Sequence, residues 1–187
     1  VAQEGDSVVI SGVINERVTI NTNVTIRGPR PWEITPGTHM GFVQAGPTAP
    51  TAVSGSPIFT IPAGKKVTIE DLNIRNGSSA NGGAISNAGT LDLKGVTIYQ
   101  SLATNGGAVY NSGKLTVTNS SLINNTASNG GGIFNAAGGT TRINHATLSA
   151  NTGGSIHNAN GTAGSTSVAG SILTGSGVPV LEALRIS

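Results

Sequence analysis

The carboxylates are the residues of this chain best suited to acid–base or cation-binding chemistry. They are Glu4, Asp6, Glu16, Glu33, Glu70, Asp71, Asp92 and Glu182. Hydrolysis of a polysaccharide requires two carboxyl groups close together, and calcium-assisted cleavage requires a cluster of them. Between residues 72 and 181 the only carboxylate is Asp92, so the repetitive part of the chain cannot supply a pair. We expect no catalytic residues, and the one alternative is a cluster of Glu70, Asp92 and Lys94.

The histidines and the absence of cysteine argue against a metal centre. His39, His145 and His157 share no metal-ligand spacing with one another or with a nearby acidic residue. A chain without cysteine forms neither a disulfide nor a thiolate metal site. We therefore expect no metal site and no cofactor.

The charges are few and dispersed. The formal net charge is +2, and the ten Lys and Arg residues are spread along the chain, with one adjacent pair at Lys65–Lys66. Nucleic-acid binding needs basic residues gathered on one face. No apolar stretch approaches the roughly 20 residues that a membrane-spanning helix needs. We expect neither a nucleic-acid partner nor insertion into a membrane.

A short phrase rich in Gly and Asn occurs four times, at residues 81–87, 105–111, 130–135 and 153–158. The copies end in Asn87, Asn111, Asn135 and Asn158, which follow one another by 24, 24 and 23 residues. A fixed period in this range is typical of a solenoid, in which each coil buries its apolar face against the next. The asparagines before the glycines are expected in turns with positive φ. They are Asn81, Asn105 and Asn129.

Two further columns of apolar residues keep the same period. Short β-branched or Leu-rich runs begin at residues 67, 91, 115, 141 and 166, and Ile or Leu stands at 74, 98, 122, 148 and 173. Three short strands per period predict an all-β fold, a three-sided right-handed parallel β-helix with about 24 residues per coil. A β-sandwich does not require three columns to recur in register, and left-handed β-helices usually carry hexapeptide repeats.

Alternation along a strand assigns the faces of the repeated phrase. If Ile85 points inward, Asn87 does too, whereas Ser86 points outward. The four phrase-ending asparagines are therefore predicted to stack as an internal ladder in which each amide donates to the next carbonyl. The outward column beside the ladder reads Ser86, Tyr110, Phe134 and His157. Its three ring-bearing residues are predicted to form an exposed strip that could bind a sugar ring or a partner surface.

We expect a single β-helix domain spanning residues 1–187. Residues 1–27 are predicted to form N-terminal coils, residues 28–57, which contain six prolines, a lateral loop, and residues 58–175 the regular coils. Residues 176–187 are apolar for a tail and are expected either to cap the last coil or to contact a neighbouring subunit. The apolar residues proposed for this self-association are Val178, Val180, Leu181, Leu184 and Ile186.

The repeated phrases resemble those of a known group of proteins. Gly-Gly-Ala followed by Ile or Val, with the later phrases at residues 122–125 and 148–151, resembles the GGA[ILV] and FxxN repeats of the chlamydial polymorphic outer-membrane proteins. It is similar, too, to bacterial and archaeal surface proteins with pectate-lyase-like right-handed β-helices. The second phrase departs from that pattern by having Leu in place of Phe. The resemblance implies a secreted or surface-displayed module used in adhesion or as a scaffold.

These observations favour a non-enzymatic structural protein outside the cell or on its surface. The expected role is that of an adhesin-like module or a subunit of a head-to-tail filament. Its expected partners are further copies of itself, surface glycans, or host or cell-surface proteins. The alternatives are a carbohydrate-binding module that uses the aromatic strip, and a polysaccharide lyase or hydrolase on the same fold.

Overall fold

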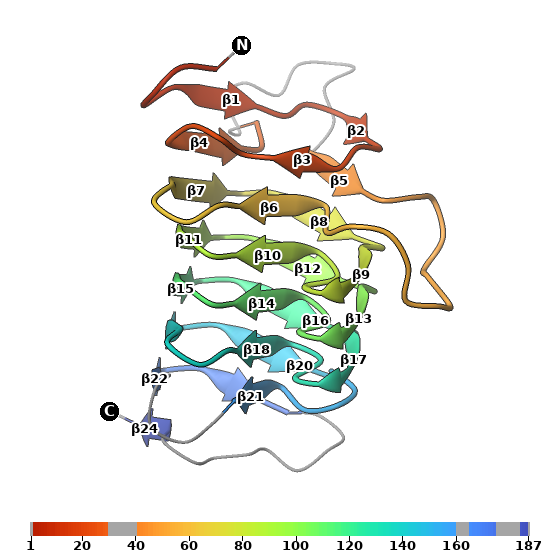
Figure 1. Cartoon of the computed structure of the whole chain (residues 1–187), viewed down its shortest axis with the longest axis vertical. Helices are drawn as coiled ribbons and strands as arrows, with labels where there is room; N and C mark the ends of the chain where they lie inside the picture. The colour runs from red at the N-terminus through yellow and green to blue at the C-terminus, as the bar shows by residue number, and fades with distance from the viewer. Residues whose placement is uncertain (1, 30–40, 160–164, 175–183, 187) are drawn as a thin grey trace.

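The chain folds as a solenoid of short parallel strands (Figure 1). The computed structural model describes residues 2–29, 41–159, 165–174 and 184–186. Every regular element named within those ranges is a strand, and its partners are parallel strands of the neighbouring coils. Residues that occupy equivalent positions in the central coils lie 24 apart in the chain. The predicted all-β parallel solenoid is therefore confirmed.

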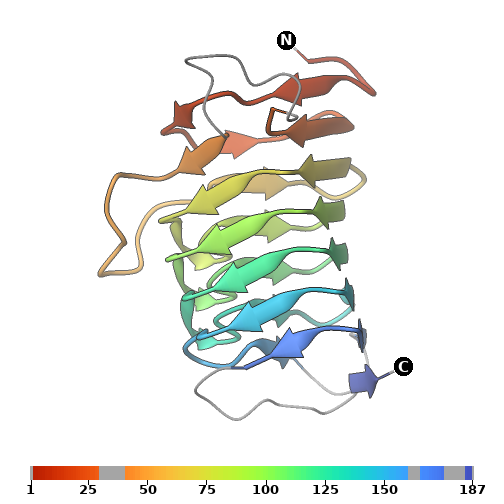
Figure 2. The ribbon, with the colours of Figure 1, turned by 180° about the vertical axis from the view of Figure 1, so that it is seen from behind.

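Two long sheets run the length of the solenoid. Sheet A contains β1 (Ser7–Val9), β4 (Val24–Arg27), β7 (Lys66–Glu70), β11 (Thr90–Lys94), β15 (Lys114–Thr118), β19 (Thr140–Asn144), β22 (Ser165–Ala169) and β24 (Leu184–Ile186). Sheet B contains β2 (Val13–Ile14), β5 (Phe42–Gln44), β8 (Asn73–Arg75), β12 (Thr97–Tyr99), β16 (Ser121–Ile123), β20 (Thr147–Ser149) and β23 (Ile172–Leu173). From behind, the strands of sheet B lie one above another in chain order (Figure 2).

A third long sheet and one short sheet close the coils. Sheet C contains β3 (Val18–Thr19), β6 (Phe59–Ile61), β10 (Ile85–Asn87), β14 (Val109–Asn111), β18 (Ile133–Asn135) and β21 (Ile156–Asn158). Sheet D contains β9 (Ser78–Asn81), β13 (Leu102–Asn105) and β17 (Thr126–Asn129). Three strands per coil were predicted, so sheet D, which covers the corner between sheets B and C in the central coils, is an addition to the expected plan.

The core is built column by column, because alternate residues of each strand point into the coil. In sheet A, Val67, Leu91 and Leu115 pair in register and are at most 1% exposed. In sheet B, Ile74 and Ile98 pair in the same way and are completely buried. Each coil therefore covers the apolar residues of the next, and a coil without a neighbour leaves its own uncovered.

Two corners of the coil are turned by residues with left-handed backbone. After sheet A they are Asp71, Gly95, Asn119, His145 and Gly170, with φ of 51°, 63°, 50°, 51° and 54°. After sheet B they are Asn76, Gln100, Asn124 and Ala150, with φ of 59°, 55°, 54° and 53°. Asn and Gly tolerate this conformation better than other residues, so their recurrence at these positions follows from the turn.

The glycines of the repeated phrase are required by the approach to sheet C. Gly82, Gly106 and Gly130 have φ of 73°, 69° and 61°, and a Cβ on any of them would meet the backbone of the following strand. The expectation that the preceding asparagines have positive φ is wrong. Those asparagines instead end β9, β13 and β17, where they form an outer amide ladder: Asn105 donates to Asn81 at 3.0 Å and Asn129 donates to Asn105 at 2.9 Å.

The phrase-ending asparagines form hydrogen bonds along the inside of sheet C. The Nδ2 group of Asn87 donates to Oδ1 of Asn111 at 2.8 Å, Asn111 donates to Asn135 at 2.9 Å, and Asn135 donates to Asn158 at 3.2 Å. The first three are completely buried and Asn158 is 7% exposed. Burying an amide without a hydrogen-bond partner costs free energy, so each coil stabilises the next by providing the partner of its asparagine.

A second pair of buried asparagines lies at the corner between sheets B and D. Asn125 donates from Nδ2 to Oδ1 of Asn151 at 3.2 Å and to the carbonyl of Ile98 at 3.0 Å. Asn151 donates to the carbonyl of Leu122 at 2.8 Å. These are the asparagines of the LxxN phrase, so both repeated phrases end in a buried amide that bonds across coils.

The coils absorb changes of length at two turns. Residues 112–113 connect sheet C to sheet A in one coil, whereas residues 136–139 do so in the next, where Gly138 has φ of 82°. Residues 124–132 connect sheet B to sheet C in one coil, and only residues 150–155 do so in the next. The shorter connection keeps one bridge, Thr126 to Thr152, in place of a strand, so sheet D ends there.

The prediction that residues 28–57 form a lateral loop is wrong for Phe42–Gln44. These residues are β5, which lies between β2 and β8 in sheet B. None of the six prolines falls within β5, so the strand can donate to its neighbours. The connection that follows, residues 45–58, leaves the sheets and projects from the side of the solenoid (Figure 1).

The amide ladder makes a prediction about stability. Replacing Asn111 by Ala removes its bonds to Asn87 and Asn135 and leaves buried groups unpaired, so we expect a loss of about 1–3 kcal/mol in unfolding free energy. The matched control is Asn105→Ala in the outer ladder, for which we expect a loss below about 1 kcal/mol. Urea unfolding followed by circular dichroism measures both, and equal losses would contradict the role given to burial.

Candidate functional site

Three aromatic side chains stack on the outer face of sheet C. Tyr110, Phe134 and His157 occupy one register column of β14, β18 and β21. The ring centroids of Tyr110 and Phe134 are 5.4 Å apart with 7° between the planes, and those of Phe134 and His157 are 5.0 Å apart with 8°. The column above continues with Ser86 of β10, which has no ring.

This geometry limits what the stack can bind. All three side chains are half-buried, and the ring planes lie across the solenoid axis, so the faces of Phe134 are covered by its two neighbours. Only the rim of the rings, the Tyr110 face toward Ser86 and the far face of His157 are left for a ligand among the described residues. A sugar that stacks flat on an aromatic face would therefore meet Tyr110 rather than the strip as a whole.

The carboxylates of the central coils lie on the outside of sheet A. Glu70 is in register with Lys94, whose Nζ lies 3.0 Å from its Oε1 in an exposed ion pair. Such a surface pair contributes at most about 1 kcal/mol. Asp92 is in register with Thr68 and Thr116. The structure thus places the residues of the alternative cluster, Glu70, Asp92 and Lys94, on one strand pair, with Lys94 bonded to Glu70.

The two described histidines lie apart from these carboxylates along the chain of coils. His145 takes a left-handed turn position with φ of 51°, His157 ends the aromatic stack, and His39 lies outside the described residues. Within the described ranges no group of three or more His, Cys, Asp or Glu residues could hold a metal ion. No helix in the described part of the chain has the length and apolarity needed to cross a membrane.

A cluster on the outer face of sheet B was missed in the sequence. The Arg75 guanidinium lies over the rings of Phe42 and Tyr99, at 5.4 Å and 6.0 Å from their centroids. Its Nε donates to Oε1 of Gln44 at 2.6 Å, and Gln44 in turn donates to Asn15 at 2.7 Å. The 24-residue step from Arg75 to Tyr99 indicates that these two residues lie in one register column. The sequence did not predict β5, which supplies Phe42 and Gln44.

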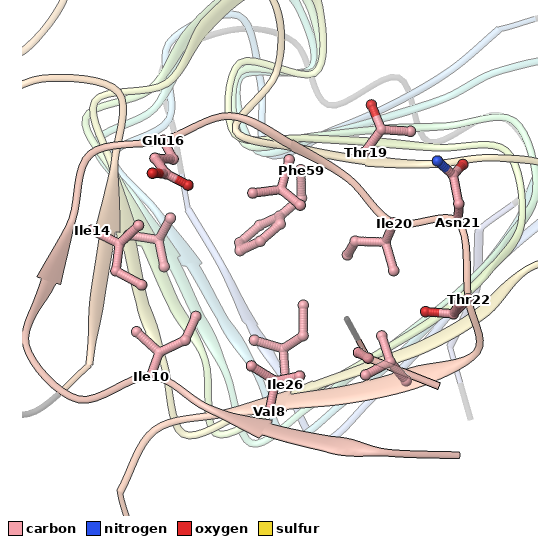
Figure 3. A pocket seen from close by; sticks show the side chains of 14 residues that line it. Val8, Ile10, Ile14, Glu16, Thr19, Ile20, Asn21, Thr22, Ile26 and Phe59 are labelled. Atoms are coloured by element: carbon pink, nitrogen blue, oxygen red, sulfur yellow. The ribbon is translucent and has the colours of Figure 1, made fainter. Parts of the chain in front are cut away.

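The N-terminal end of the solenoid opens into an apolar cavity of about 430 Å³ (Figure 3). Apolar side chains from all three long sheets line it, and Glu16 is the one charged residue among them. In Figure 3, Ile10, Ile14, Ile20 and Ile26 point into this space around Phe59. The cavity is the interior of the first coil, and none of the residues 2–29, 41–159, 165–174 and 184–186 forms a further coil over it.

The exposed valines of the first coil belong to the same end. Val8, Val9, Val13 and Val18 are 38%, 44%, 56% and 37% exposed. Val8 is in register with Ile26, which is 6% exposed, and Ile26 is in register with Ile69, which is completely buried. The same column position is therefore core in the interior coils and open surface in the first coil.

The C-terminal segment predicted to cap or to contact a subunit is described in part. Val178, Val180 and Leu181 lie outside the described residues. Leu184 and Ile186 belong to β24, which pairs in parallel with β22 and extends sheet A by one strand.

The class that this geometry defines is a parallel β-solenoid repeat protein. No protein-family profile, curated protein sequence or solved structure matches the chain. The resemblance to the polymorphic outer-membrane protein repeats accordingly rests on the repeated phrases alone.

The aromatic stack predicts an energetic coupling between its members. In a double-mutant cycle with Tyr110→Ala and Phe134→Ala, we expect a coupling of about 0.5–1.5 kcal/mol in unfolding free energy, because the rings lie in contact. The matched control is a second cycle with Tyr99→Ala and Phe134→Ala. Tyr99 lies on sheet B, so its coupling to Phe134 should be no more than about 0.5 kcal/mol. Equal coupling in the two cycles would show that the stack contributes nothing specific.

Proposed function

We propose that the chain is a non-enzymatic structural subunit of the cell exterior, which assembles with its own copies or serves as an adhesin-like scaffold. The observation that carries this proposal is the open first coil, where apolar side chains that are core elsewhere line a cavity at the end of the solenoid. Large exposed apolar surfaces of this kind mark sites of association.

The strand edges at the same end support the proposal. In the described residues β1 pairs with β4 alone, β2 with β5 alone and β3 with β6 alone, so each presents one free edge. Unpaired backbone groups beside an apolar surface favour the addition of further strands. A partner that supplies another coil would satisfy both the edges and the cavity.

A location outside the cell is supported by the repeated phrases. They resemble the GGA[ILV] and FxxN repeats of polymorphic outer-membrane proteins, and this resemblance supports a secreted or surface-displayed β-helix. The partners that we propose are further copies of the chain and, for an adhesin-like role, surface glycans or proteins of host or neighbouring cells.

Binding of carbohydrate by the aromatic stack is the second candidate. It is favoured by the Tyr110 face toward Ser86, since that face has no neighbouring ring within the stack. The polar residues of the adjoining outer ladder, Asn81 and Asn105, offer amide groups on the neighbouring sheet.

The assembly proposal predicts that a charge on the first coil disperses the assemblies. Val9→Glu places a carboxylate on the edge strand β1, and we expect it to shift the wild-type oligomers to monomer in light scattering across a concentration series. The matched control is Val53→Glu, since Val53 is 43% exposed, like Val9 at 44%, but lies in the lateral connection. A wild type that stays monomeric at every concentration would overturn the proposal, and so would a Val9→Glu variant that assembles normally.

The carbohydrate candidate predicts loss of glycan binding in one double variant. If the stack binds sugars, the Tyr110→Ala and Phe134→Ala double variant should lose glycan-array signals that the Tyr99→Ala variant retains. Wild-type protein without signals would remove this candidate. Turnover of a uronate polymer that Asp92→Asn abolishes would replace both proposals by a lyase or hydrolase.

A further inference from the structure

Sheet A begins and ends, among the described strands, with a strand that has one partner. In the described residues its first strand, β1, pairs with β4 alone, and its last strand, β24, pairs with β22 alone. The eight strands between and including these edges are all parallel and in continuous register. An added strand that keeps this geometry must also be parallel.

The register specifies which residues would meet if one copy continued the sheet of another. One register column of sheet A points outward in β1 to β22 and reads Ser7, Thr25, Thr68, Asp92, Thr116, Arg142 and Ser167; in register, the next residue, in β24, is Arg185. Continued across two copies, this column sets Arg185 of one chain beside Ser7 of the next. The next register position sets Ile186 of one chain beside Val8 of the next, the exposed valine at the cavity.

The charges along the chain favour this polarity. The first coil carries Glu4, Asp6 and Glu16 against Arg17, and all four are exposed. From Lys94 to residue 181 the sequence has no carboxylate, while Lys114 and Arg142 add positive charge toward the other end. Two first coils brought together would oppose like charges, whereas residues 165–187 carry one carboxylate, Glu182, and one cation, Arg185, so a first coil meets no net like charge there.

We propose that the free edge of β1 is the docking site for β24 of a second copy, so that copies join head to tail with sheet A continuous across the junction. This inference rests on the proposed assembly and adds its polarity, its partner strand and its register. Head-to-tail contacts of this kind do not close on themselves and produce an open filament.

The absence of cysteine from the chain allows a clean test by disulfide cross-linking. Parallel neighbours in a sheet lie about 4.8 Å apart, within the Cα separation of about 4.4–6.8 Å that a disulfide spans. We expect the Ser7→Cys, Arg185→Cys double variant to give a ladder of cross-linked multimers on oxidation, reversed by dithiothreitol. The matched control is Ser7→Cys with Ser167→Cys, one strand further from the junction, which should give no ladder.

Each outcome separates this proposal from the assembly on which it rests. If Ser7→Cys alone yields a cross-linked dimer, the copies meet by their first coils and the head-to-tail junction is wrong. If the protein assembles but neither double variant cross-links, the β1–β24 register is wrong although assembly stands. If no variant and no wild-type protein assembles, the proposed function itself fails.

A charge exchange provides a second test without cysteine. Ser7 would stand in register with Arg185 of the neighbouring copy, so Ser7→Arg should set like charges side by side and lower the assembled fraction measured by sedimentation velocity. Combining Ser7→Arg with Arg185→Asp replaces the like charges by unlike ones and should restore assembly. A Ser7→Arg variant that weakens assembly without rescue in the combination would overturn the proposed contact, as would a Ser7→Arg variant that assembles like wild type.

Discussion

The structure depends on one constraint: an amide that points into the coil must find its partner in the next coil. Asn111 lies in the middle of this chain of contacts, since it accepts from Asn87 and donates to Asn135, to the carbonyl of Thr140 and to the hydroxyl of Thr141. In a dry interior each of these groups is expensive to leave unpaired. The spacing of 24 residues is therefore held not only by apolar stacking but by a polar requirement with fixed geometry.

Where the coil changes length, the change lies outside this chain of contacts. The turn around Gly138 is two residues longer than the equivalent turn of the preceding coil, and it follows Asn135 in the chain, so the bond from Asn135 to Asn158 is unaffected. Residues are lost between Asn151 and Ile156, where the connection to sheet C shortens and the fourth strand is reduced to one bridge. The buried asparagines stay in register through both changes, and the loss of residues shortens sheet D instead.

The interior could be predicted from the sequence because two periods act together there, two residues along a strand and about 24 along the chain. Both the Val67 column and the Asn87 ladder follow from them. The features that the sequence did not predict, β5 and the Arg75 cluster, do not follow these two periods. β5 stands alone among prolines and is selected by its pairing with β2 and β8, and the Arg75 cluster depends on β5. The outer asparagines of sheet D are strand residues rather than turn residues, because the glycines that follow them adopt the positive φ of the turn.

The equivalence of the central coils has a consequence for how such a protein varies. Asn87 and Asn111 occupy the same backbone position, bond in the same direction and lie one full coil apart. Excision of residues 88–111, or duplication of them, would keep the same kinds of neighbours in the columns of Val67, Ile74 and Asn87 and leave both amide ladders unbroken. The interior therefore places no limit on the number of coils, and the length of the solenoid is free to change by whole units of sequence. Selection on length would act through the two ends, where one coil differs from the next.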